Sequence, residues 1–204
     1  MNERDVEQIR QAVLLYYDAK RFSHVEGVVA EAEALGRIYL PERVCELKAA
    51  AYFHDITKRL DYKKQLQYCK EFGIILNDID LASPPVLHSL TAAELVRREF
   101  PEYATEDIVD AVRYHTTGRA EMSVFEQIIY LADLIEQTRT FDDCVTLRAY
   151  FYNLLNDGVD KTQAMRMAII RSFDNTIKRL TEQDAPIHSD TVIARNYYLT
   201  FDNV

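Results

Sequence analysis

Apolar residues recur at helical spacing along most of the chain. Val6, Ile9, Val13 and Tyr17 stand three or four positions apart, which is the period of one face of an α-helix. The same period predicts helices over residues 3–19, 23–36, 41–54, 62–72, 84–100, 105–115, 123–139, 143–155, 161–180 and 192–199. No stretch of useful length alternates between apolar and polar residues as a strand would. The pattern therefore predicts an all-α protein, a bundle of about nine to eleven helices.

Capping signals predict the ends of several of these helices. Ser23 followed by Glu26 has the pattern of a capping box, so we expect a helix to begin at Ser23, with His24 in its first turn. Gly73 and Gly118 are natural helix stops. Residues 77–85 are expected to form a loop.

Composition and charge narrow the class of protein. The 204 residues suit one domain, 1–204, and 48% of them are apolar, which is enough for a sizeable core. Because only five Gly and five Pro are present, long irregular segments are not expected. The formal net charge of −9 argues against a surface that binds nucleic acid or an anionic membrane. We therefore expect neither partner, although a small basic pocket for phosphates stays compatible with this charge.

The chain shows no targeting signal. Its first residues are charged and lack a signal-peptide pattern, and no apolar run approaches the ~20 residues that a membrane span needs. Cys45, Cys69 and Cys144 are far apart and form no CxxC motif, so we interpret them as reduced, mostly core thiols. These features predict a cytoplasmic protein.

Two acidic residues stand in apolar stretches that predict buried helices. Asp55 follows His54 at the end of one such stretch, and Asp133 interrupts the run 128–135. Burying a charge is costly unless a partner neutralises it. The His54–Asp55 pair, taken alone, fits an isolated polar contact, a helix-end ion pair or half of a metal site.

Four of the five histidines fall near the ends of different predicted helices. They are His24, His54, His88 and His115. A bundle can bring such residues and the two aspartates to one point in its core, as helical metal proteins do. Imidazole and carboxylate ligands without Cys suit a first-row divalent ion. His188 follows Pro186 in a polar tail, and we expect it to be exposed and without a role.

The order His, His-Asp, Asp resembles the signature of HD-domain metal-dependent phosphohydrolases, and His88 and His115 match members with an enlarged site. More closely, four motifs resemble the YqeK-type subfamily of bacterial symmetrical dinucleoside tetraphosphate hydrolases. They are Arg21-Phe22-x-His24, His54-Asp55-Ile56-Thr57-Lys58, His115-Thr116-Thr117-Gly118 and Tyr130-Leu131-Ala132-Asp133-x-Ile135-Glu136-x-x-Arg139. The resemblance covers most of the chain. Gln137 departs from the pattern, which has Pro there, but occupies no ligand position.

The resemblance implies a metal site and a domain plan. A core of about 21–139 would carry the site, with C-terminal helices 143–200 packed on it. His24, His54, Asp55 and Asp133 would hold a divalent transition metal, which the family pattern suggests is iron, with Mn, Co and Ni as alternatives. His88 and His115 would bind a second ion beside Asp55, contact phosphate, or act as acid and base.

The implied reaction is attack by water at the centre of a tetraphosphate bridge, which converts diadenosine tetraphosphate to two ADP. Such hydrolysis needs positioning, neutralised charge and an activated water. Asp55, Lys58, His88 and His115 are the expected catalytic residues. The residues expected to contact substrate or product are Arg21, His24, Asp55, Ile56, Thr57, Lys58, His88, His115, Thr116, Asp133, Arg139 and Asn175.

Other interpretations stay open at this point. An HD phosphohydrolase could act on a nucleoside monophosphate, a deoxynucleoside triphosphate or a cyclic dinucleotide, and the chain could also be a nucleotide-binding regulatory module. A di-metal HD oxygenase is disfavoured because Arg21, Lys58 and Arg139 suit phosphate. The Tyr-rich C-terminal helices could form a homodimer face or part of the core.

Overall fold

The computed structural model describes residues 1–200 as eleven α-helices joined by short turns. The helices are α1 (Glu3–Val13), α2 (Ala19–Tyr39), α3 (Val44–Phe53), α4 (Tyr62–Phe72), α5 (Asp78–Ala82), α6 (Leu87–Glu99), α7 (Glu106–Tyr114), α8 (Val124–Ile135), α9 (Asp142–Asn156), α10 (Lys161–Glu182) and α11 (Ser189–Thr200). No strand occurs among these residues, which confirms the all-α prediction.

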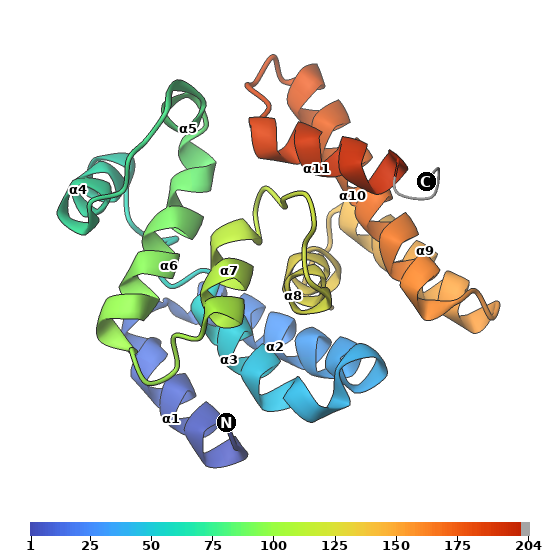
Figure 1. Cartoon of the computed structure of the whole chain (residues 1–204), viewed down its shortest axis with the longest axis horizontal. Coiled ribbons are helices and arrows are strands. Elements are labelled where there is room, and N and C mark those ends of the chain that lie inside the picture. Colours follow the sequence, from blue (N-terminus) through green and yellow to red (C-terminus); the bar gives the residue numbers. More distant parts are fainter. Residues whose placement is uncertain (201–204) are drawn as a thin grey trace.

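Helix α8 lies at the centre of the bundle (Figure 1). It packs on α2, α3 and α7 on one side and on α9 and α10 on the other. Its apolar side chains Ile128, Ile129 and Leu131 are fully buried. Removing apolar surface from water is the main favourable contribution to folding, so this helix anchors the core. Helices α1, α4 and α6 extend the first group of helices, whereas α11 packs on α10. Asp133, in the last turn of α8, is thereby held where the helices meet.

Several predicted helix ends are confirmed. Gly73 caps the end of α4 in the left-handed region, with φ of +73°, where a side chain would be strained. Gly118, with φ of +65°, ends the turn that follows α7. Thr105 caps α7 and Ser123 caps α8 in a full capping box with Glu126. These ends depend on neighbours within one turn of the chain, which is why the sequence indicates them.

Several predicted boundaries are wrong. Helix α1 ends at Val13 and not near residue 19, and α8 ends at Ile135 and not at residue 139. Helix α2 begins at Ala19, because the Asp18 side chain accepts a hydrogen bond from the backbone N–H of Arg21 at 2.8 Å. Ser23 is therefore inside the helix, and Glu26 accepts a hydrogen bond from Arg10 instead of closing a capping box. Residues 77–85 are not a plain loop, since Asn77 forms a capping box that starts the short helix α5.

His188 is buried, contrary to the expectation of an exposed tail residue. Only 5% of it is exposed, and its Nε2 lies 3.0 Å from Oδ1 of Asp80 in α5. The backbone N–H of Asp190 donates to Nδ1 at 3.2 Å, so the Nε2–H group donates to Asp80. The contact joins residues 108 positions apart, and no local pattern indicates such a pairing.

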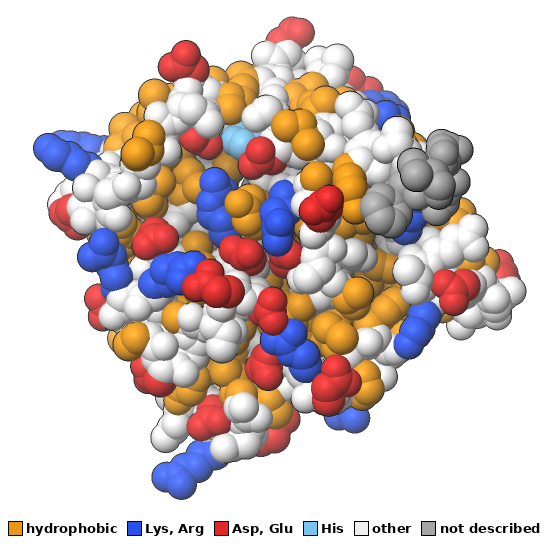
Figure 2. Space-filling view, in the orientation of Figure 1, with side chains coloured by type: hydrophobic (Ala, Val, Ile, Leu, Met, Phe, Trp, Pro, Cys, Tyr) orange, Lys and Arg blue, Asp and Glu red, His pale blue; other side chains and the backbone are white. Residues whose placement is uncertain are grey.

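The surface of the described chain carries mixed charge. On the face shown in Figure 2, basic and acidic side chains are interspersed and neither forms one large patch. No helix among residues 1–200 is long and apolar enough to cross a membrane. Cys69 is buried, whereas Cys45 and Cys144 are partly exposed, and all three thiols are free. The expectation of mostly core thiols therefore holds for one of the three.

Candidate metal centre and phosphate pocket

The structure brings the predicted histidines and aspartates to one point. His24 lies in α2, Asp133 in the last turn of α8, and His54 at the end of α3, directly before Asp55. His88 lies in the first turn of α6, and His115 follows α7. Two overlapping groups can each hold a metal ion, with ligand atoms within 4.8 Å of one another: His24–His54–Asp133 and His54–Asp55–His115.

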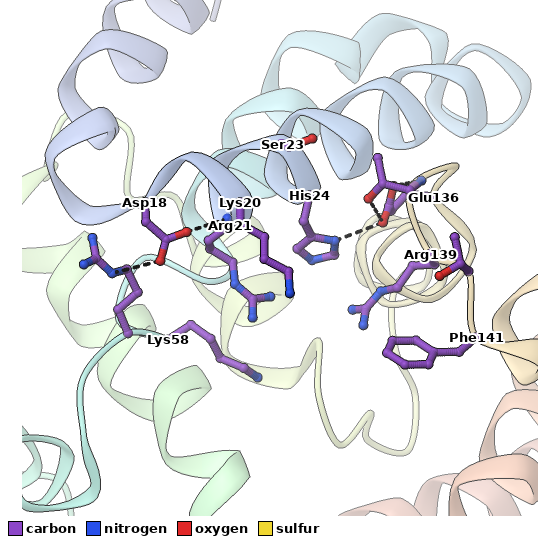
Figure 3. Close-up of a pocket in the computed structure, with 12 residues that line it drawn as sticks. Asp18, Lys20, Arg21, Ser23, His24, Lys58, Glu136, Arg139 and Phe141 are labelled. Carbon is purple, nitrogen blue, oxygen red and sulfur yellow. Dashed lines mark hydrogen bonds and ion pairs between the residues drawn. The ribbon is translucent and has the colours of Figure 1, made fainter.

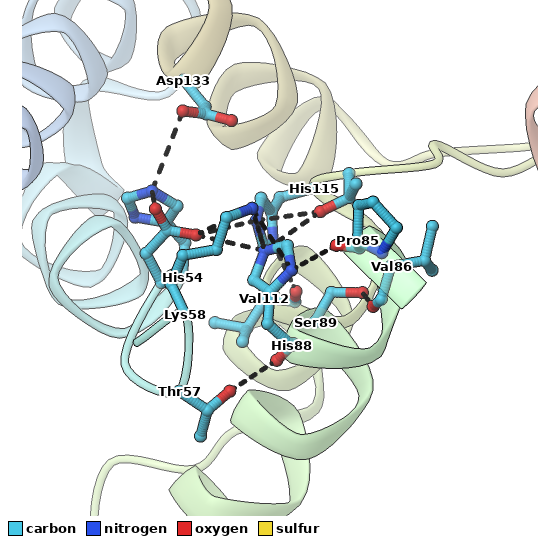
Figure 4. Close-up of polar contacts among 12 residues, drawn as sticks. His54, Thr57, Lys58, Pro85, Val86, His88, Ser89, Val112, His115 and Asp133 are labelled. Carbon is cyan, nitrogen blue, oxygen red and sulfur yellow. Dashed lines mark hydrogen bonds and ion pairs between the residues drawn. The ribbon is translucent and has the colours of Figure 1, made fainter. Parts of the chain in front are cut away.

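Three of the imidazoles are oriented in the same way. His54, His88 and His115 each donate Nδ1–H to the carbonyl three residues earlier, at 2.7, 2.6 and 2.7 Å. This hydrogen bond leaves the lone pair on Nε2, which points to the centre of the cluster (Figure 4). His24 differs, because its Nδ1 lies 3.0 Å from the carboxylate of Glu136.

Asp55 belongs to the second group and also faces the first, with Oδ2 3.8 Å from Nε2 of His24. Its Oδ1 is 3.1 Å from Nε2 of His88 and 3.6 Å from Nε2 of His115, while its Oδ2 is 2.9 Å from Nη1 of Arg21. Burial alone would raise the pKa of the Asp55 carboxyl, but His54 and the other imidazoles outweigh it and hold that pKa well below its usual range. Asp55 is therefore an anion that faces both groups.

Asp133 and His24 form the second charged pair of the cluster. Oδ1 of Asp133 lies 3.0 Å from Nε2 of His24 and 2.5 Å from Nη2 of Arg139. The Asp133 side chain is 14% exposed, so the predicted burial is nearly complete. Burial alone would lower the pKa of His24, but the carboxylates of Asp133 and Glu136 raise it to about 9. In the absence of a metal, the His24 ring is therefore protonated on both nitrogens, and positively charged, at neutral pH.

The donor atoms fit a divalent metal. Nε2 of His88 and Nε2 of His115 lie 3.0 Å apart and both face Oδ1 of Asp55. Burial lowers the pKa of His88 to about 4 and also lowers that of His115, so both rings present lone pairs. Nε2 of His24 and of His54 is buried without a well-directed hydrogen bond. Lone pairs and carboxylates that face one point repel one another unless a cation lies between them. Imidazole and carboxylate ligands together suit a first-row divalent metal.

A basic pocket of about 650 Å³ opens beside the cluster. Arg21, Lys58 and Arg139 point toward the same space near His24 (Figure 3). Lys20 and Arg59 also line the pocket, which makes five cations against the two acids Asp18 and Glu136. In a chain of net charge −9, this local excess of positive charge indicates a site for a polyanion.

A second pocket of about 510 Å³ adjoins the first, because both are lined by Arg139 and Phe141. Asn175, one of the residues expected to contact substrate, and its neighbour Thr176 line it from α10. Its other walls include the apolar side chains of Leu134 and Leu147. Two acidic and two basic side chains also line this pocket, which is more apolar than the first, so it suits a partly apolar group with polar edges.

Two residues expected to contact substrate are directed elsewhere. Ile56 is 2% exposed and belongs to the core. The hydroxyl of Thr57 is buried and donates to the carbonyl of His88 at 2.8 Å, which orients α6. Neither side chain lines the two pockets. Thr116, in contrast, places its hydroxyl 3.1 Å from Nε2 of His115, at the cluster.

Sequence reasoning missed the residues that orient the site. Glu136 stands inside a quoted motif, which was its only signal, and it contacts His24. Arg148 of α9 had no signal at all. Its guanidinium donates to the backbone carbonyls of Ile135, Glu136 and Arg139, and so holds the turn that carries Arg139.

Comparisons with known proteins agree with this geometry. The model of the HD domain family matches residues 21–138. The chain is 33% identical to a Halalkalibacterium halodurans protein over 93% of this chain and 94% of that protein, and 32% identical to a Bacillus subtilis protein over 88% and 90%. Both relatives are named symmetrical bis(5'-nucleosyl)-tetraphosphatase.

A solved structure from Clostridium acetobutylicum is also similar, with a TM-score of 0.82 and 31% identity over 96% of this chain and 97% of that one. It is described as a predicted HD superfamily hydrolase involved in NAD metabolism. The matched segment begins at Arg21 and ends one residue before Arg139, so it contains every candidate metal ligand. The chain therefore belongs to the HD domain family, in the branch whose curated members are named symmetrical bis(5'-nucleosyl)-tetraphosphatases.

Proposed function

We propose that this protein hydrolyses dinucleoside tetraphosphates symmetrically, so that diadenosine tetraphosphate and water give two molecules of ADP. The observation that carries the proposal is the basic pocket, where Arg21, Lys58 and Arg139 stand beside a cluster of metal-binding groups. A tetraphosphate bridge carries several negative charges in a row, and such a pocket neutralises them. The names of the curated relatives point to the same substrate.

The candidate ligands of a first ion are His24, His54, Asp55 and Asp133, which we propose bind iron or another first-row divalent metal. When bound, the metal lowers the pKa of a coordinated water and polarises a phosphoryl oxygen. His88 and His115 are the candidate ligands of a second ion, because their Nε2 atoms face Oδ1 of Asp55. Metal analysis of the purified protein by mass spectrometry would give both the element and the number of ions per chain.

The cationic side chains bind and orient the phosphates. Arg21 and Arg139 each pair with a carboxylate of the cluster, at 2.9 and 2.5 Å, and keep their remaining N–H groups for phosphate. Lys58 Nζ lies 3.2 Å from Nε2 of His88. Burial lowers the pKa of Lys58, which makes its ammonium a better proton donor to the leaving phosphate. With no second ion bound, the lone pair on Nε2 of His88, whose pKa burial lowers to about 4, would instead accept a hydrogen bond from the attacking water.

The pocket lined by Asn175 and Thr176 would bind one nucleoside. It shares Arg139 with the phosphate pocket, so a nucleoside diphosphate half can extend from one pocket to the other. The middle of the bridge would then lie at the metal cluster, which is what cleavage into two equal halves requires. The helices α9 and α10 build this pocket, so we propose that residues 1–204 act as one domain.

The test is to incubate metal-loaded protein with diadenosine tetraphosphate and to separate the nucleotides by chromatography. ADP as the sole product supports the proposal, whereas AMP with ATP would place the metal one phosphate away from the centre. Turnover of a monophosphate, a deoxynucleoside triphosphate, a cyclic dinucleotide or NAD in place of the tetraphosphate would favour another HD phosphohydrolase. Nucleotide binding without turnover would favour a regulatory module. Light scattering would test the homodimer, which stays a prediction.

A further inference from the structure

We propose that Glu136 is a positioning residue that sets the orientation of His24 for the metal, and that Gly27 is glycine because it makes room for the Glu136 carboxylate. The inference rests on the proposed metal centre and deepens it. Neither Glu136 nor Gly27 is one of the candidate ligands.

His24 uses a different acceptor from the other histidines. His54, His88 and His115 stand at helix ends, where Nδ1–H reaches the carbonyl three residues earlier. His24 lies inside α2, and its Nδ1 instead faces a side chain from another part of the chain, the Glu136 carboxylate, with Oε1 3.0 Å away. The orientation of this ring therefore depends on Glu136.

The Glu136 carboxylate is held in place from several directions. Its side chain is fully buried, at the residue that follows α8. The backbone N–H of Thr138 donates to Oε2 at 2.5 Å, and the Thr138 hydroxyl donates to Oε1 at 2.7 Å. A carboxylate fixed in this way accepts the Nδ1–H bond and leaves Nε2, 3.0 Å from Oδ1 of Asp133, as the His24 atom that would bind the metal in place of its proton.

Gly27 lies one turn after His24 in α2 and faces the Glu136 carboxylate. A Cβ atom at Gly27 would stand 2.2 Å from Oε2 and 3.0 Å from Cδ of Glu136. Glycine in the middle of a helix is normally destabilising, so its presence in α2 needs a reason. The reason here is steric, because any other side chain would displace the carboxylate.

The prediction concerns metal affinity, measured without substrate. Glu136→Ala and Gly27→Ala should each weaken the binding of Mn²⁺ or Co²⁺ to metal-free protein by roughly 10- to 100-fold, the usual effect of losing such a partner. Glu136→Gln should restore part of the affinity, because its amide oxygen accepts the same hydrogen bond. Circular dichroism of the metal-free variants checks that they fold.

A double variant and a control make the test specific. If Gly27 acts only by making room for Glu136, Gly27→Ala should add nothing to Glu136→Ala. Gly36→Ala is the control in the same helix as Gly27. A Cβ atom at Gly36 would stand 2.7 Å from the side chain of Leu47 in α3 and does not meet Glu136, so this variant should leave metal affinity unchanged.

Two results would overturn the proposal: wild-type affinity in Glu136→Ala, or an equal loss in Gly36→Ala and Gly27→Ala. Neither result bears on the tetraphosphatase assay, which uses the unaltered protein. Conversely, an unaltered protein that binds metal but leaves the tetraphosphate intact would refute the proposed function alone.

Discussion

Replacement of His188 by Ala should destabilise the protein without changing its chemistry. The imidazole is buried and donates to Asp80 at 3.0 Å, and so joins the start of α11 to α5. The substitution removes this donor and leaves the Asp80 carboxylate, 7% exposed, without its main partner. Asp80 keeps one hydrogen bond, from the backbone N–H of Asn77 to Oδ2 at 2.9 Å, so its charge is not left wholly unsatisfied.

The expected loss of stability depends on the one hydrogen bond that Asp80 keeps. Removing one partner of a fully buried charged pair costs about 3–5 kcal/mol, and a single hydrogen bond to a charged group contributes about 1.5–3 kcal/mol. For His188→Ala we therefore expect a loss of about 2–3 kcal/mol in the free energy of unfolding. In a chain of 204 residues, this loss corresponds to a fall in Tm of roughly 4–12 °C.

Urea denaturation and thermal melts of the metal-free protein measure the change. The variant Asp80→Asn, which still accepts the His188 hydrogen bond, should lose less, and the double variant should lose less than the sum of the two. Turnover per folded molecule at 25 °C should stay at the wild-type level, since His188 lines neither pocket. An unchanged Tm would refute the reasoning on stability, and a collapse of turnover in a folded variant would mean that His188 belongs to the site.

Three further predictions concern the site. Asp133→Ala should abolish both metal retention and hydrolysis, because it removes an anionic ligand; full activity with the metal still bound would contradict the assignment. The pKa of His24 is raised to about 9 in the metal-free protein, so metal binding at pH 7 should release a proton and affinity should rise with pH up to about 9, which calorimetry in buffers of different ionisation enthalpy measures. A pH-independent affinity would be inconsistent with a protonated His24. Arg148→Met frees the turn that carries Arg139 and should lower kcat/KM roughly 10- to 100-fold; the exposed Arg37→Met is its control, and equal kinetics in both would remove the role given to Arg148.

The local pattern of the sequence determined most of the helices, whereas the candidate ligand set followed from the resemblance to HD-domain phosphohydrolases. Helical period and caps act within a few residues, so Thr105, Ser123 and Gly73 mark helix ends in both sequence and structure. Asp133 is identifiable as a special residue for the same reason, because one carboxylate in an apolar run needs a partner.

Only the tertiary structure decided which residues pair with the buried polar side chains. His24 and Glu136 are 112 positions apart, and Asp80 and His188 are 108 apart, so no period links them. The side chain of Glu26 likewise pairs with Arg10 of α1 and not with Ser23, although the start of α2 itself is set locally by the Asp18 cap. A local pattern shows that a polar residue needs a partner, but the partner is chosen by the packing of helices that are distant in the sequence.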